Sequence, residues 1–599
     1  MGRNRARFST LLFFQNAKNP CCSRQGQRRQ IISENTMRLS RLEVENFKGV
    51  GIRQVIDLKP ITLLFGPNSA GKSTILQALH YVREILERQN PDPDQTIAGG
   101  LIDLGGFRNL IHNHDLSKAM AIKLVIDLSD DQGSERLPIN NGNSLGSPEF
   151  ENLRIRYIVG ENTDLKEYAV VQQIGISLEM RWSDLINAPF VSTLIVEMDG
   201  ERVATIKSPP QSGQAQLTDF NFQHPLLEEY KDADDEVQDT DAESDPIGTK
   251  LSAEFWELSR DMATAIDIKD SNEFRVAAAS VIGALPEIDK PWDLELRDPE
   301  PNKFELENST PRVRGLSALL DELIIGPLRI ARDYLSDMTY IGPLRDIPPR
   351  AFRPQFSPDE GRWAQGLAAW DLLYSDPKGT LLDSVNAWLN GEDRLATSYE
   401  IAKSEYLEIP VSSRIDQLFK RGISEDDIGE LQEEFQKLTS RTEIVLRDVV
   451  RGINVAPSDV GVGISQMIPV IVGCLRDKDG ILAIEQPELH IHPAIQVGVG
   501  DLFIQAVMPG ESSFGSGKTL LVETHSEHIM LRLLRRVRET SEGELPPGVP
   551  SLIPKNLSVI YVETTDEGVI FRPLRVSGDG DFMDRWPKGF FEERAEELF

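Results

Sequence analysis

The stretch Gly66-Pro-Asn-Ser-Ala-Gly-Lys-Ser73 decides the fold of this chain. Glycines at 66 and 71 let the backbone wrap closely around phosphate oxygens, with its N–H groups pointing inward. Lys72 supplies a cation to the outer phosphates, and the Ser73 hydroxyl can bind Mg²⁺. The stretch predicts a phosphate-binding loop whose nucleotide contacts come from Gly66, Pro67, Asn68, Ser69, Ala70, Gly71, Lys72, Ser73 and Thr74.

The segments on both sides of this loop have the pattern that it requires. Residues 61–65 (ITLLF) form a short continuous apolar run, which is typical of a central buried strand. After the loop, apolar residues at 75, 76, 79, 82 and 85 recur at helical spacing. Residues 38–47 alternate apolar and polar side chains, and a further strand is expected at 55–58. Strand, loop and helix in this order argue against a chance match.

Composition limits the classes of partner. The formal net charge of −31 gives a surface that repels nucleic acid on average, so any DNA site must be a local basic groove. The chain has 40% hydrophobic residues but no apolar run long enough to cross a membrane. Its three cysteines, Cys21, Cys22 and Cys474, form neither a disulfide framework nor a CxxC metal pair, which fits a reducing, cytoplasmic compartment.

The chain of 599 residues divides into four predicted parts. Residues 1–36 form a basic tail that we expect to be disordered, although a signal or transit peptide is an alternative, and Met37 would begin the folded domain. Residues 37–120 form an N-terminal lobe, and residues 121–339 a large α+β insertion. Within the insertion, the carboxylate-rich run 228–245 predicts a disordered loop, or alternatively an acidic interaction arm. Residues 340–599 form a C-terminal lobe.

A second motif is the segment Ile481-Leu-Ala-Ile-Glu-Gln-Pro-Glu488. Its four apolar residues predict a buried strand that delivers Glu485 to the carboxyl edge of a parallel sheet, where ligands bind. Glu485 is therefore a candidate Mg²⁺ ligand, against the alternative of an ordinary strand end. Residues 519–522 form a similar run that ends in Glu523. The preceding stretch 515–519 (GSGKT) resembles the end of a second phosphate-binding loop, but it precedes a strand and predicts a surface loop.

Two weaker signals accompany these motifs. Ser465, in the stretch 461–467 (GVGISQM), can cap the helix that begins there or bind an anion, and capping is the preferred interpretation. His525 lies just past a strand, where it can contact a phosphate or a water, although a histidine in a loop is common. The histidines also raise the question of a zinc site, but no cysteine or fixed motif supports one at His490, His492, His525 and His528.

The four features in this order resemble an ABC-type ATPase of the SMC/RecF/OLD branch. They are most similar to the bacterial RecF-like predicted ATPases of the AAA family, many of which are linked to phage defence. The Walker A motif falls on 66–73, the signature on Gly463 to Gln466, the Walker B on 481–485 and the switch histidine on His525. Three further stretches fit this group, namely Asn46-Phe47-Lys48, Tyr340-Ile-Gly-Pro-Leu-Arg345 and residues 582–593 (FMDRWPKGFFEE).

The resemblance implies an α/β fold of the P-loop NTPase type, with an ABC/SMC-like head domain whose largely parallel sheet is flanked by helices. It implies ATP and Mg²⁺ as cofactors, with Ser73 and Glu485 on the metal. It also implies a homodimer that holds two ATP molecules, with Lys72 of one subunit facing Ser465 of the other. The catalytic residues would be Lys72, Glu485, His525 and the residue after the Walker B acid.

That last position departs from the family pattern, because it holds Gln486 instead of glutamate. Glutamine can orient a water but cannot accept its proton, so either Glu485 or Glu488 is the base, or turnover is slow. The C-terminal nuclease domain of the OLD branch does not fit in the residues that follow His525. Any nuclease activity would have to come from a separately encoded partner.

Two functional hypotheses remain open. In the first, the ATPase acts on or senses nucleic acid through basic residues at 345, 350, 353, 532, 535, 536 and 538, although these could equally be solvated surface charges. In the second, the protein is a regulatory switch in which ATP closes the dimer to recruit or restrain a protein effector. A small-molecule kinase is a distant third, because it would not need the signature serine and the switch histidine together.

Overall fold

The computed structural model describes residues 37–96, 99–128, 171–210, 215–227, 276–278, 280–292, 317–350, 352–438, 440–508 and 518–585. The predicted basic tail and the acidic run 228–245 lie outside these residues. Among the described residues, no helix is both long and apolar enough to cross a bilayer.

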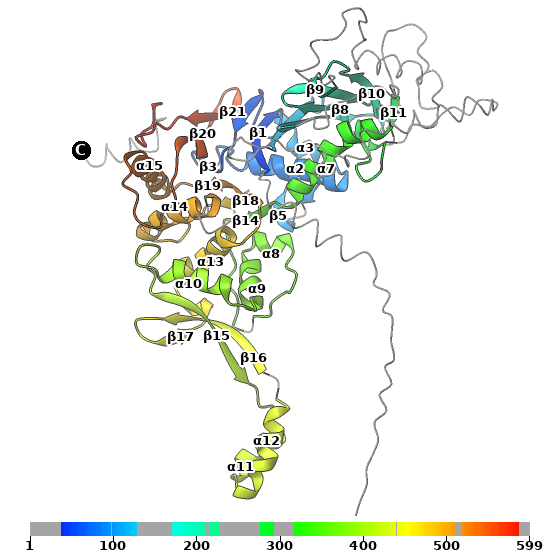
Figure 1. Cartoon of the computed structure of the whole chain (residues 1–599). Helices are drawn as coiled ribbons and strands as arrows, with labels where there is room; N and C mark the ends of the chain where they lie inside the picture. Colours follow the sequence, from blue (N-terminus) through cyan, green and yellow to red (C-terminus); the bar gives the residue numbers. More distant parts are fainter. Residues whose placement is uncertain are drawn as a thin grey trace, which may run out of the picture.

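A six-stranded sheet forms the centre of the head (Figure 1). Its strands are parallel except for the last, which pairs antiparallel with its neighbour. The predicted strands at 61–65, 481–484 and 519–522 are confirmed, as is the largely parallel sheet. In spatial order the strands are β14 (Thr339–Ile341), β18 (Gly480–Glu485), β19 (Lys518–Glu523), β3 (Ile61–Phe65), β20 (Leu557–Thr565) and β21 (Gly568–Leu574).

Helices cover both faces of this sheet, because its strands alternate their apolar side chains between two cores. Leu64 and Ala483 point into one core with α2 (Thr74–Arg88) and α7 (Gly326–Ser336). Leu63 and Ile484 point into the other, which contains the remaining large helices of the head. These are α8 (Glu360–Ala364), α9 (Leu367–Ser375), α10 (Thr380–Asn390), α13 (Val462–Leu475), α14 (Pro493–Val507) and α15 (Glu527–Glu542).

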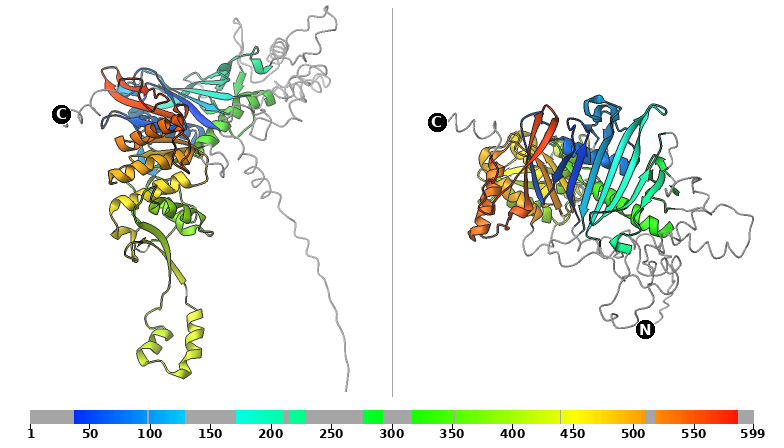
Figure 2. Two further views of the ribbon diagram at one scale, coloured as in Figure 1. Left: turned by 60° about the vertical axis from the view of Figure 1, so that its left-hand side comes forward. Right: turned by 90° about the horizontal axis from the view of Figure 1, so that it is seen from above.

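A second, eight-stranded antiparallel sheet lies beside the central one (Figure 2). Its members β1, β2 and β6 come from the N-terminal lobe, and the strands of the predicted insertion continue the same sheet. The predicted boundary at residue 120 therefore falls where β6 begins and does not separate two sheets. In spatial order the strands are β11 (Val276–Ala278), β10 (Ala215–Phe220), β9 (Glu201–Lys207), β8 (Ala188–Met198), β7 (Gln173–Ser183), β6 (Met120–Asp127), β1 (Arg38–Glu45) and β2 (Gln54–Asp57).

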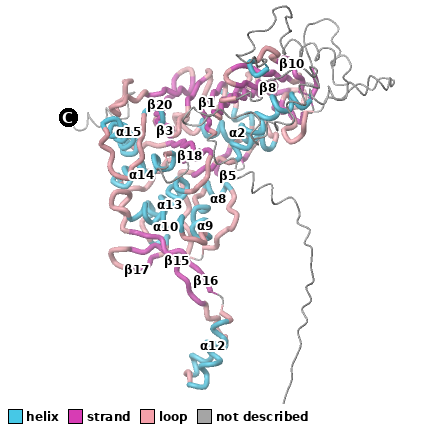
Figure 3. The backbone as a smooth tube through the Cα atoms, in the orientation of Figure 1, coloured by secondary structure: helices cyan, strands magenta, loops and turns pink. Residues whose placement is uncertain are grey.

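Short elements connect these layers (Figure 3). A π-helical stretch at Asp321–Ile325 comes directly before α7. The other short elements are β4 (Gln95–Thr96), β5 (Gly99–Asp103), α3 (Phe107–Leu110), a 3₁₀ turn at His112–His114, another at Pro225–Leu227, β12 (Ser280–Ile282), β13 (Leu285–Pro286) and a 3₁₀ turn at Pro554–Asn556.

An arm projects from the C-terminal lobe away from both sheets (Figures 1 and 2). A hairpin of β15 (Tyr399–Leu407) and β16 (Ser440–Asp448) carries two short helices at its tip, α11 (Arg414–Arg421) and α12 (Ile428–Gln436). Ser424 and Asp427 form a capping box before α12. The helix expected after Ser424 is therefore present, whereas its place on a projecting arm was not predicted. The chain then returns through β17 (Ile453–Val455) and the 3₁₀ turn Pro457–Asp459 to α13.

Candidate nucleotide site

The phosphate-binding loop is fixed by close contacts that only glycine permits. A Cβ atom at Gly66 would lie 2.2 Å from the Val562 carbonyl oxygen, and the φ of +152° at this residue is unfavourable for other residues. Gly71 has φ of +97° and packs against Val569. The loop leads directly into α2, whose N-terminus adds partial positive charge. The sequence motif thus forms the cradle that it predicts.

Lys72 lies against this loop. Its Nζ donates to the carbonyl oxygens of Gly66 and Pro67, at 3.1 and 2.8 Å. The same Nζ is 3.8 Å from Oε1 of Glu523. Burial lowers the pKa of Lys72, although the neighbouring carboxylates oppose this effect. The ammonium group is thus presented at the mouth of the loop beside acidic side chains.

Glu523 is the carboxylate that contacts the loop serine, and the sequence analysis did not assign it a role. The Ser73 hydroxyl donates to Oε2 of Glu523 at 2.6 Å. The reason is the strand order, because β19 lies between β3 and β18 and brings its last residue next to the loop. Glu485, which was expected beside Ser73, is one strand further away. The signal was present in the sequence, since both apolar runs end in a carboxylate.

Glu485 is held by a tyrosine from the neighbouring strand. The Tyr340 hydroxyl on β14 donates to Oε1 of Glu485 at 3.0 Å. Glu485 and Glu523 are register partners across β18 and β19, so their side chains lie at the same edge. Burial, with the repulsion of Glu523 added to it, raises the pKa of Glu485 to about 7. Burial also raises the pKa of Glu523.

Gln486 and Glu488, which follow the Walker B acid Glu485, make different contacts. Gln486 has φ of +45°, and its backbone N–H donates to the Glu523 carbonyl oxygen at 2.7 Å. Glu488 accepts from the Thr524 hydroxyl and from the His525 backbone N–H, both at 2.7 Å. Because both carboxylate oxygens of Glu488 are engaged, Glu485 is the better placed of the two candidate bases.

His525 points an unsatisfied atom toward this site. Its Nε2 is buried and has no hydrogen-bond partner. Burial lowers the pKa of His525, and the charge of Lys72 lowers it further. An atom of this kind is available to bond a ligand. This observation fits a phosphate oxygen near both side chains.

Arg345 connects the end of β18 to the signature helix α13. Its guanidinium is almost fully buried and donates to the carbonyl oxygens of Glu485 and Gln486, at 2.7 and 3.0 Å. It also reaches the carbonyl of Gln466, whose amide in turn donates to the Arg345 carbonyl. Burial lowers the pKa of Arg345 to about 10. The partners are backbone carbonyls, so the arginine fixes the backbone of both segments.

The placement of Ser465 corrects two expectations. The helix begins at Val462 with Gly461 as its N-cap, so Ser465 does not cap it. Ser465 is buried and its hydroxyl donates to the Pro457 carbonyl oxygen at 2.8 Å, which leaves no free hydroxyl for a second subunit. Nearby, a Cβ atom at Gly463 would lie 2.3 Å from the His490 carbonyl oxygen. Gly463 is half-buried, and the exposed residues of this segment are Gly461 and Val462, just before the signature.

Most of the basic residues considered for nucleic acid are engaged within the chain. Arg345 is buried, and Arg350 pairs with Asp459. On α15, Arg536 is buried against Asp501 and Glu539. Asp501 also pairs with the arginine at 532, and Glu539 with the arginine at 535. Three of the four arginines on this helix are therefore in ion pairs, whereas Arg538 is exposed.

The histidines do not form the metal site that was considered. No group of three or more histidine, cysteine or acidic side chains in the described residues has the geometry of a metal site. His492 instead caps α14, where its Nδ1 accepts from the Ala494 backbone N–H at 3.2 Å. The surface loop predicted at 515–519 is wrong for Lys518 and Thr519, which are buried at the start of β19, and residues 515–517 lie outside the described residues.

The residues present fit ATP with Mg²⁺. A helix N-terminus, the Lys72 ammonium and the unsatisfied His525 Nε2 suit phosphate oxygens. The Ser73 hydroxyl with the carboxylates of Glu523 and Glu485 supplies the hard oxygen ligands that Mg²⁺ prefers.

Family comparisons match both halves of this site. Residues 37–189, which contain the phosphate-binding loop, match the family model described as "AAA ATPase domain". Residues 358–531, which contain the signature and both strand-end carboxylates, match the one described as "AAA domain, putative AbiEii toxin, Type IV TA system". Two stretches of the chain are therefore similar to ATPase domains of the AAA family. Among curated proteins, none matches this ATPase significantly.

Solved structures similar to the ATPase include SMC head domains. One is an SMC head bound to the C-terminal winged-helix domain of ScpA, at 10% identity and a TM-score of 0.33, covering 90% of this chain and 98% of that one. Another is the SMC head domain from Thermotoga maritima, at 9% identity and a TM-score of 0.32, covering 90% of this chain and 100% of that one. At these scores the comparison says nothing about the activity or partners of this ATPase.

The first prediction separates the two carboxylates. Glu523→Gln should weaken binding of Mg·ATP by about tenfold relative to Glu485→Gln, because only Glu523 reaches Ser73. Isothermal titration calorimetry with Mg²⁺ and with excess chelator measures the difference. Both variants should bind metal-free ATP like the native protein. A larger loss of Mg²⁺ dependence in Glu485→Gln would reverse the assignment.

The second prediction concerns the pH dependence of stability without nucleotide. The pKa of Glu485 is raised from 4.5 to about 7, so the folded state holds its proton more tightly than the unfolded state does. The free energy of unfolding should therefore fall as pH rises through this window, by up to about 3 kcal/mol from this group. Urea unfolding of the native protein and Glu485→Gln, at pH values spanning the window, measures the difference. If the free energies of unfolding of the native protein and Glu485→Gln changed in parallel with pH, the raised pKa of Glu485 would be contradicted.

Proposed function

We propose that this protein is an ATP-gated switch that hydrolyses ATP slowly and closes a dimer around it to control a protein effector. The observation that supports the ATPase site most directly is the contact of Ser73 with Glu523, beside Lys72 and Glu485. The ion pairs of three of the four arginines on α15 weaken the support for direct action on nucleic acid. The regulatory hypothesis is therefore the stronger one.

In the proposed hydrolysis, different side chains bind the phosphates, bind the metal and accept the proton. Lys72, the loop amides and His525 bind the phosphates, while Ser73 and Glu523 hold the metal, which neutralises phosphate charge when bound. Tyr340 fixes one oxygen of Glu485, and the other oxygen accepts the proton of the attacking water. Gln486 lies next to this base and orients the water without taking its proton.

The exposed first turn of α13 is the proposed contact for a second copy. Gly461 and Val462 are exposed, and the N-terminus of this helix carries partial positive charge that suits a phosphate presented by another subunit. Ser465 supports this turn from inside through its bond to Pro457. We therefore assign the contact with the phosphate of the other subunit to the backbone of the first turn and not to the Ser465 hydroxyl.

The third prediction tests the reaction. Purified protein should show ATP turnover above a Lys72→Ala blank, without stimulation by duplex DNA. Gln486→Glu should raise turnover by about tenfold or more, because it restores a second proton acceptor. A coupled phosphate-release assay measures both. DNA stimulation that weakens steeply with salt would contradict the regulatory hypothesis and favour action on DNA.

The fourth prediction tests the dimer. Val462→Arg should leave ATP binding intact but abolish the ATP-dependent dimer, because it places a long cation on the exposed first turn of α13. Ile186→Arg, in the exposed turn between β7 and β8, is the matched control. Sedimentation velocity with a non-hydrolysable ATP analogue reports the assembly. Normal dimerisation of Val462→Arg would refute this interface.

A further inference from the structure

The tip of the arm exposes an apolar surface. Of the twenty large apolar side chains that are exposed in the described residues, seven lie between residues 406 and 428. Phe419 on α11 is 53% exposed and Ile428 at the start of α12 is 51% exposed. Such a concentration in one short projection indicates an interaction site. The seven are Tyr406, Leu407, Ile409, Val411, Phe419, Ile423 and Ile428.

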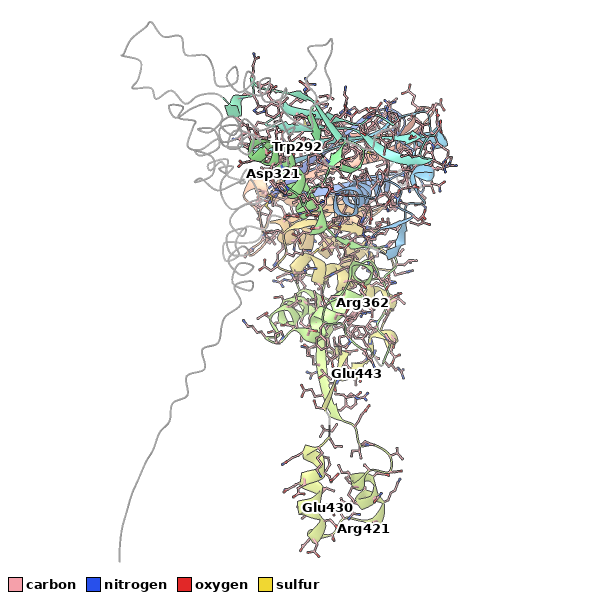
Figure 4. The ribbon with its side chains drawn as sticks, turned by 90° about the vertical axis from the view of Figure 1, so that its right-hand side faces the viewer. Trp292, Asp321, Arg362, Arg421, Glu430 and Glu443 are labelled. Carbon is pink, nitrogen blue, oxygen red and sulfur yellow. The ribbon has the colours of Figure 1, made fainter. Side chains whose placement is uncertain are left out.

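The tip helices bury little of their own surface. In α11 only Ile415 and Leu418 are buried, and α12 has no buried residue. Helices of eight and nine residues are too short to be stable without packing partners. The tip is held at the end of the β15–β16 hairpin, away from the head (Figures 1 and 4). A surface at this position can be covered without disturbing the nucleotide site.

The charges around this surface identify its partner. Every cation in the described part of the tip is already in an ion pair, as with Arg414 and Glu430 and with Arg421 and Asp427. The two lysines pair with Asp416 and Glu434. Three further carboxylates, on exposed residues, have no ion-pair partner within the described part of the arm, namely Glu425, Asp426 and Glu433. These three carboxylates, called the acidic rim below, give the tip an excess of negative charge in addition to its exposed apolar side chains.

The acidic rim disfavours several classes of binding partner. A second copy of the tip would bring the same unpaired carboxylates together, which is repulsive. Nucleic acid and anionic lipid are repelled for the same reason. A protein segment with apolar and cationic side chains satisfies both features of the surface at once.

We propose that the arm tip, through the exposed Phe419, Ile423 and Ile428 and the acidic rim, docks a cationic amphipathic segment of a partner protein. The arm returns directly into α13, whose first turn faces the proposed dimer. The docking surface goes beyond the proposed ATPase, and it is present whether or not ATP is hydrolysed.

The test uses the full chain and a defined probe. A fluorescein-labelled peptide of leucine and lysine at amphipathic helical spacing is titrated with the protein, and anisotropy gives the affinity. A peptide with glutamate in place of lysine is the probe control. Phe419→Ser should weaken binding of the lysine peptide by about tenfold or more. Phe356→Ser is the matched control, because Phe356 is 88% exposed on the head, and it should change nothing.

The charge requirement is tested in the same assay. The double change Glu425→Gln and Asp426→Asn should weaken binding and flatten its dependence on salt. The matched control is Glu392→Gln with Asp393→Asn, an adjacent acidic pair in the turn after α10. Equal losses in tip and control variants would mean adhesion to an acidic surface in general and would overturn the proposal. Binding of the glutamate peptide would also overturn it.

Two further measurements keep the test independent of folding and of self-association. ATP affinity of each tip variant should equal that of the native protein, because none of these residues touches the nucleotide site. Loss of ATP binding together with peptide binding would mean that the tip is a structural element and would overturn the proposal. Sedimentation without nucleotide should show a monomer. Self-association that Phe419→Ser abolishes would show that a second copy covers the tip.

Discussion

The parallel pairing of β19 between β3 and β18 is the constraint on which the site depends. This order puts three chain segments, far apart in sequence, at one edge of the sheet. It places Glu523 against the serine of the phosphate loop and leaves Glu485 one strand away, within reach of Tyr340. Two carboxylates that share a buried edge repel each other when both are charged, which is why burial and mutual repulsion raise the pKa of Glu485. The strand order thus determines which carboxylate, Glu523, lies beside the proposed metal and which, Glu485, is left as the proposed base.

Arg345 extends this constraint to the signature helix. A buried guanidinium without a carboxylate partner is unusual, and here the donors go to backbone carbonyls at the end of β18 and in α13. Carbonyls are weaker partners than carboxylates, and this explains why the pKa of Arg345 falls with burial. Burying this charge costs free energy, but the one side chain holds the end of β18 and helix α13 together. Movement at the end of β18 must therefore move α13 or break these bonds.

The sequence predicted what local pattern determines. The phosphate loop, its strand and its helix follow from adjacent residues, and the structure has all three. The contact of Glu523 with Ser73 depends on strand order, which no local pattern encodes. Ser465 was misplaced for a related reason, because its partner Pro457 lies on a turn whose path depends on the arm. The arm itself was missed because its hairpin and short helices have no repeat or long period, and exposure of apolar residues is visible only in three dimensions.

The charge of the protein and the position of the arm lead to one functional argument. In a chain of net charge −31, three of the four arginines on α15 and the cations at the tip of the arm are in ion pairs, which reduces the attraction of both surfaces for an anionic polymer. What the arm does expose is apolar surface with an acidic rim. The arm ends where α13 begins, and α13 is tied through Arg345 to the strand that carries Glu485. A partner bound at the tip and a nucleotide bound at the sheet edge therefore act on opposite ends of one connected path.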